Sequence, residues 1–139
     1  MRKKLNIHVY PTMYDIDLIV CTKASAVEEF AKQYTYRNGD PIDIKAIKDW
    51  TAVTASCIRK SDERRALMVY INRIKGDSAI ERDAHLTNSI MHEAFHVAMD
   101  TWDMIDEELS YNHQEAQAYY VGWVAECIYK SYRHEYSRE

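Results

Sequence analysis

A stretch without glycine or proline, residues 80–101, constrains the fold of this chain more than any other feature. Ser78 stands just before it, and Glu81 follows three positions later, which is the capping-box pattern of a helix start. The apolar residues that recur inside the stretch at helical spacing are Ile90, Ala94, Val97 and Ala98. Together these signals predict a long helix that begins near residue 78 or 79 and buries one face.

In the remaining segments, the sequence predicts strands and helices that are largely segregated along the chain. We predict strands at residues 6–10, 17–21, 51–60 and 66–73, and further helices at 24–34 and 112–132. Residues 42–50 fit both a strand and a short helix. Because strands and helices are segregated along the chain, we predict an α+β fold with a small antiparallel or mixed sheet packed on helices. The length of 139 residues suits a single domain that covers residues 1–139.

The two predicted strands before the long helix are joined by a charged loop, and we expect them to pair antiparallel. The second of them, at residues 66–73, has two interpretations. As an edge strand it would bind an extended peptide by main-chain pairing, next to the helix that follows. As an internal strand of the sheet it would only contribute to the core.

The charge and the cysteine content argue against several classes of protein. A net charge of -4 and a pI near 5.9 argue against nucleic-acid binding through a broad basic surface. No stretch is long and apolar enough to span a membrane, and Asn6 and His8 interrupt the apolar run that a signal peptide needs. The three cysteines form no C-x-x-C pair and sit in apolar segments, so we expect buried free thiols. We therefore expect a cytoplasmic protein with no nucleic-acid or membrane partner.

Within the long predicted helix, residues 92–96 have the H-E-x-x-H spacing of a helix-borne zinc site. Positions i and i+4 lie on one helix face about one turn apart, so His92 and His96 can bind a single Zn²⁺ ion. Glu93 falls beside them, where its carboxylate can act on a water molecule at the metal. This arrangement is typical of metal-assisted hydrolysis, which also requires a third protein ligand.

Glu115, near the start of the last predicted helix, is the best candidate for the third ligand. An antiparallel helix after a connecting loop would bring its first turns back toward the two histidines. Asn112, three positions earlier, leaves a second interpretation open, in which Glu115 only completes a capping box. His113 is the alternative ligand, and Glu107 and Glu108 in the preceding acidic loop are weaker candidates.

Two segments taken together resemble a known group of enzymes. The H-E-x-x-H segment at 92–96, followed by E-A-Q-A-Y at 115–119, looks like the gluzincin group of small zinc metallopeptidases, including the ImmA/IrrE-type proteins of phages and bacteria. The resemblance covers about residues 81–132. It implies a minimal zincin-like fold, in which the Zn²⁺ ligands are His92, His96 and Glu115 and the general base is Glu93.

The function that this resemblance implies is zinc-dependent hydrolysis of a peptide or protein substrate. The developing oxyanion needs a donor besides zinc, and Tyr119 is favoured because it shares a helix face with Glu115. An alternative is a non-catalytic zincin-fold protein, such as a phage accessory or regulatory factor, with a structural or vestigial zinc site. A third interpretation is a chance H-E-x-x-H, which predicts no zinc. The metzincin pattern is excluded, because Met99 and Trp102 occupy the positions of its glycine and third histidine.

Overall fold

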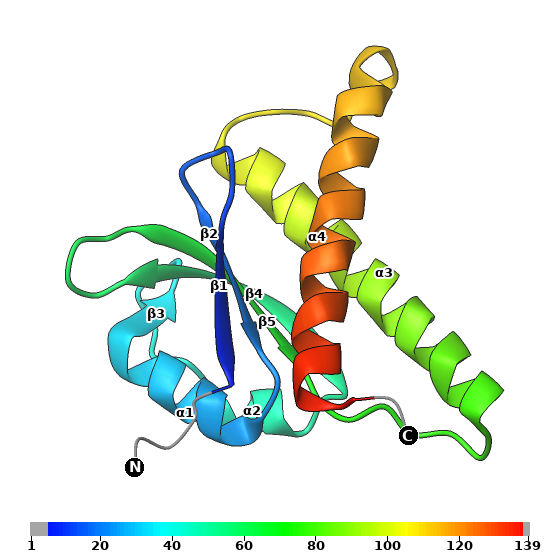
Figure 1. Ribbon diagram of the computed structural model, residues 1–139. Helices are drawn as coiled ribbons and strands as arrows, with labels where there is room; N and C mark the ends of the chain where they lie inside the picture. Colours follow the sequence, from blue (N-terminus) through cyan, green and yellow to red (C-terminus); the bar gives the residue numbers. More distant parts are fainter. Residues whose placement is uncertain (1–5, 138–139) are drawn as a thin grey trace.

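The computed structural model describes residues 6–137 and shows a five-stranded sheet with helices packed on both faces (Figure 1). The strands are β1 (Ile7–Pro11), β2 (Asp17–Cys21), β3 (Tyr34–Tyr36), β4 (Ala52–Arg59) and β5 (Arg65–Ile71). Their order in the sheet is β1-β2-β5-β4-β3. β2 and β5 pair in parallel, whereas all other neighbours pair antiparallel, so the sheet is mixed. The predicted α+β fold is confirmed.

The helices lie between and after the strands. They are α1 (Ala24–Gln33), α2 (Ile44–Lys48), α3 (Ala79–Met104) and α4 (Gln114–Glu135), and a 3-10 turn, η1 (Tyr111–His113), precedes α4. The ambiguous segment 42–50 contains α2, whose start is capped by the Asp43 side chain accepting a hydrogen bond from the Ala46 N–H at 3.0 Å. No helix in this part of the chain has the length and apolar character needed to cross a lipid bilayer.

β5 is an internal strand of the sheet, because β2 pairs with one of its edges and β4 with the other. The antiparallel pairing of β4 with β5 confirms the predicted hairpin. The expectation of a peptide-binding edge strand at residues 66–73 is wrong, and the internal interpretation is correct. Every residue from Ala66 to Ile71 is buried, as expected for a strand covered on both faces.

The sheet separates two hydrophobic cores. Successive side chains of a strand point to opposite faces, so β5 contributes to both cores. Leu67, Val69 and Ile71 pack with residues of α3 and α4, whereas Met68 and Tyr70 pack with residues of α1 and α2. The three cysteines are buried free thiols, as predicted, and they are Cys21, Cys57 and Cys127.

The start of α3 follows the predicted capping box. The Ser78 hydroxyl accepts a hydrogen bond from the Glu81 N–H at 3.1 Å, and the Glu81 carboxylate accepts one from the Asp77 N–H at 2.7 Å. α3 contacts β4, β5 and α4, while α4 contacts β2, so the two long helices lie side by side over one face of the sheet (Figure 1). The buried Thr101 and Tyr120 hydroxyls are hydrogen-bonded at 2.9 Å and join α3 to α4.

Candidate metal centre

Two imidazole rings meet on the exposed side of α3, near the middle of the helix. His92 and His96 are separated by one helical turn, and their Nε2 atoms lie 3.1 Å apart. The rings are arranged edge to face, with centroids 4.7 Å apart. The Glu93 carboxylate completes the group, and one potential ligand atom from each of the three side chains lies within 4.8 Å of the others. Among residues 6–137 this is the only group of three or more side chains that could hold a metal ion.

The spacing of the two nitrogens fits a shared metal ion. Two imidazole nitrogens bound tetrahedrally to one Zn²⁺ at about 2.0–2.1 Å would be roughly 3.3 Å apart. The observed 3.1 Å between His92 Nε2 and His96 Nε2 is close to this value. The same atoms can also share a proton, with one neutral ring donating to the other. Metal binding therefore requires little movement of either ring.

Glu93 differs from the two histidines because its side chain is turned toward the sheet. It is only 3% exposed, whereas both histidines are exposed. Burial raises the pKa of the Glu93 carboxyl, because the charged form loses its hydration. His92, His96 and the hydroxyl of Thr54 on β4 act in the opposite direction. A carboxylate whose basicity is raised by burial is suited to accept a proton from water.

An open hollow of about 330 Å³ lies beside the histidine pair, between α3 and the start of β4. Its lining includes the exposed ring of Trp50 and the side chain of His85. His85 Nδ1 lies 2.9 Å from the carbonyl oxygen of Lys75, which fixes the orientation of the ring. His85 is exposed, and it precedes His92 by two helical turns, so both lie on one face of α3.

Polar contacts hold α3 against β4 and the turn after β3 on the side next to the histidines. Asp100, one turn after His96, is half-buried and accepts a hydrogen bond from the Ser56 hydroxyl at 3.4 Å. Burial raises the pKa of the Asp100 carboxyl, and the Ser56 hydrogen bond opposes this effect. Further along the helix, Asp103 forms an ion pair with Arg37 at 2.8 Å. These contacts fix the rotation of α3 about its axis, and therefore the direction in which the histidines point.

Glu115 lies apart from this group. It is exposed on α4 and lines a separate shallow hollow together with Tyr119 and Gly122. The face of α4 that packs in the core carries other residues, including Tyr120. Thr101, the partner of Tyr120, follows His92 by roughly two and a half helical turns, so His92 points away from α4. The structure therefore gives no support to Glu115 as a ligand or to Tyr119 as an oxyanion donor.

The other interpretations of the segment before α4 can also be compared with the structure. The N-cap of α4 is His113, which makes no side-chain cap hydrogen bond, so the capping box expected between Asn112 and Glu115 does not form. His113 Nδ1 lies 3.9 Å from a carboxylate oxygen of Glu107, and both side chains are largely exposed. Neither of these alternative ligands belongs to the group around His92.

Comparisons with known proteins add nothing to this geometry. No protein-family model, no curated protein and no solved structure matched the chain. The arrangement of the three side chains on α3 is therefore the feature that points to a function.

Proposed function

We propose that the protein is a zinc-dependent hydrolase of peptide bonds, a small metallopeptidase of gluzincin-like character, with Zn²⁺ held by His92 and His96. The observation that carries this proposal is the Nε2–Nε2 separation of 3.1 Å on one exposed helix face, directly beside a buried carboxyl. A bound zinc ion would act as a Lewis acid and increase the acidity of a bound water molecule.

Glu93 is the general base of the proposed reaction. Its carboxylate would accept a proton from the attacking water and then deliver that proton to the leaving amine of the substrate. Burial raises the pKa of this carboxyl and so favours proton uptake. One of its carboxylate oxygens lies within 4.8 Å of a ring nitrogen of each histidine, which is close enough to act on a water molecule at the same ion.

The hollow next to His92 provides room for the substrate. It adjoins a second hollow of about 500 Å³, and the two share Trp50, Thr51, His85 and Ser89. An extended peptide segment could lie along this groove with its scissile bond at the histidines and an apolar side chain against Trp50, which is 62% exposed. A cytoplasmic location is part of the proposal, supported by three buried cysteines that are not paired in disulfides.

The proposal of Glu115 as the third Zn²⁺ ligand comes from the sequence resemblance. Ligation by Glu115 would require α4 to turn its exposed face toward α3, whereas a two-histidine site would leave the remaining positions to water. The zinc affinity of Glu115→Gln distinguishes these arrangements. A large loss of affinity would support the gluzincin ligand set, and an unchanged affinity would restrict the site to α3.

The enzyme proposal is tested by measuring bound metal and cleavage of a peptide library by the wild-type protein and by Glu93→Gln. Glu126→Gln is a matched control, because Glu126 is an exposed residue on α4 that pairs with Lys130 at 2.9 Å. We expect zinc-dependent cleavage by the wild type and the control, and cleavage reduced by about 10²-fold or more in Glu93→Gln. Bound zinc without any Glu93-dependent cleavage would contradict catalysis and leave a metal-binding protein.

A non-catalytic metal-binding protein is the second candidate, and the observation that favours it is that, among residues 6–137, Glu93 is the only further potential ligand grouped with the histidine pair. A structural zinc site usually joins separate segments and so stabilises the fold. His92 and His96 belong to one turn of one helix, so an ion bound there would join no other element of the fold. Chelation should therefore leave the far-ultraviolet circular dichroism unchanged, and unfolding on chelation would support the structural role.

A further inference from the structure

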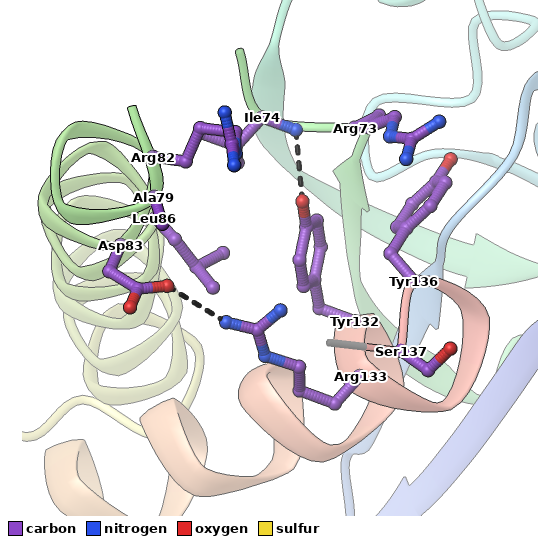
Figure 2. A pocket seen from close by; sticks show the side chains of 10 residues that line it. All are labelled: Arg73, Ile74, Ala79, Arg82, Asp83, Leu86, Tyr132, Arg133, Tyr136 and Ser137. Atoms are coloured by element: carbon purple, nitrogen blue, oxygen red, sulfur yellow. Dashed lines mark hydrogen bonds and ion pairs between the residues drawn. The ribbon is translucent and has the colours of Figure 1, made fainter. Parts of the chain in front are cut away.

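Another pocket lies on the α4 side of α3, away from the histidine pair. It has a volume of about 280 Å³ and is bounded by the start of α3, the end of α4 and the segment that follows β5 (Figure 2). None of its lining residues belongs to the group formed by His92, Glu93 and His96, although Arg73 and Ile74 also line the hollow of about 500 Å³. Arg82, Asp83 and Arg133 line neither hollow of the proposed substrate groove, so variants at these positions test the pocket independently of the metal site.

Positive charge is concentrated around this pocket. Three arginines line it, each from a different segment: Arg73 follows β5, Arg82 lies in the first turns of α3, and Arg133 lies near the end of α4 (Figure 2). Among the described residues, Asp83 is the only acidic one in the lining. A local excess of positive charge is unexpected in a chain with a net charge of -4. Like charges that converge on one cavity repel one another, and a bound anion would offset this repulsion.

The guanidinium group of Arg133 is held in a defined position. It forms an ion pair with Asp83 at 3.1 Å, and it lies over the rings of Tyr129 and Tyr132 at 5.5 and 5.6 Å. Its Nε atom is buried and has no hydrogen-bond partner among the described residues. The Arg133 guanidinium is therefore already partly dehydrated before an anion binds. This lowers the desolvation free energy that anion binding requires.

The walls of the pocket are also fixed by hydrogen bonds. The Tyr132 hydroxyl accepts a hydrogen bond from the Ile74 N–H at 3.0 Å, which joins α4 to the segment after β5 (Figure 2). Arg82 donates a hydrogen bond to the Gly76 carbonyl oxygen at 3.2 Å. Gly76 lies so close to α3 that an added Cβ atom would be 2.9 Å from the Arg82 backbone nitrogen. A side chain at position 76 would therefore displace the start of α3 and one side of the pocket.

We propose that this pocket binds a phosphate group, either free or as the monoester of a small molecule. Guanidinium groups present planar pairs of N–H donors that match the oxygen atoms of phosphate. A dianion would face Arg73, Arg82 and Arg133, and Asp83 is the described lining residue that would repel it. A cavity of about 280 Å³ accommodates a compact phosphorylated molecule and excludes a folded partner.

The test is a titration of the isotope-labelled protein with inorganic phosphate and with glycerol 1-phosphate, at constant pH and ionic strength, followed by the arginine Nε–H signals in NMR spectra. We expect saturable shifts of the Arg82 and Arg133 signals, absent from a titration with chloride. Tighter binding of the ester assigns the pocket to a phosphomonoester, and equal binding assigns it to free phosphate. Shifts that do not saturate, or that chloride reproduces, would overturn the proposal.

Variants test whether the arginines are responsible. Arg82→Gln should weaken phosphate binding by about tenfold or more, because it removes one charge-assisted donor. Arg37→Gln removes the same charge from an exposed residue outside the pocket and should leave the affinity unchanged. Asp83→Asn removes the repelling carboxylate and should strengthen binding. Equal affinities of the wild type and Arg82→Gln, or weaker binding by Asp83→Asn, would contradict the assignment.

Discussion

Replacing Glu93 by glutamine should raise the stability of the protein while abolishing its proposed chemistry. The side chain is 3% exposed, and burial raises the pKa of its carboxyl because the charged form is desolvated. A neutral amide of nearly the same shape avoids that cost. We expect the free energy of unfolding of the metal-free variant to be higher by about 1 kcal/mol, which is the usual gain from a single stabilising substitution. For a chain of this size, that corresponds to a melting temperature about 3–5 °C higher.

The assay is thermal unfolding followed by circular dichroism at pH 8, with a chelator present. Glu126→Gln, at an exposed ion pair, should change stability by less than about 0.5 kcal/mol. With zinc restored, Glu93→Gln should keep its metal affinity and lose about 10²- to 10⁴-fold in peptide cleavage, the range for a general base. A less stable metal-free Glu93→Gln protein would refute the argument from desolvation. Cleavage within about twofold of the wild type would refute the role of Glu93 as base.

Three further predictions concern the fold. Burial raises the pKa of Cys21 and Cys57 to about 12 and that of Cys127 to about 11, so Ellman's reagent should not modify the native protein at pH 8 but should modify three thiols in urea. Rapid labelling of the native protein would contradict this burial. Ser78→Ala removes the N-cap of α3 and should lower the free energy of unfolding, measured in urea, by about 1 kcal/mol. An unchanged free energy of unfolding would argue against the cap. Leu67 is fully buried in β5, so Leu67→Ala should lower the free energy of unfolding by about 2–5 kcal/mol. A decrease of less than about 1 kcal/mol would contradict the assigned core.

Local patterns in the sequence predicted the element that carries the site. The Ser78–Glu81 capping box identified the start of α3, because the residues that form it lie within one helical turn. The i, i+4 spacing of His92 and His96 then placed both rings on one face, and the structure shows this arrangement. The hairpin of β4 and β5 was predictable for the same reason, since a short loop joins neighbouring strands.

Features that depend on distant parts of the chain could not be predicted in this way. The parallel pairing of β2 with β5 makes β5 internal, but the two strands are far apart in the sequence and no local signal joins them. The rotation of α4 about its axis is set by residues such as Tyr120, which packs against α3 and leaves Glu115 exposed. A helix that returns antiparallel can present either face to its neighbour, and the order of residues alone did not determine which.

Zinc binding to the purified protein tests the central claim most directly. Isothermal titration of the metal-free protein should show one Zn²⁺ ion per chain, and His92→Ala and His96→Ala should each weaken binding by at least about 100-fold, because each removes a direct ligand. His134→Ala, an exposed histidine on α4, is the matched control and should bind like the wild type. Absence of zinc binding by the wild type, or binding that survives both His92→Ala and His96→Ala, would contradict the metal centre on α3.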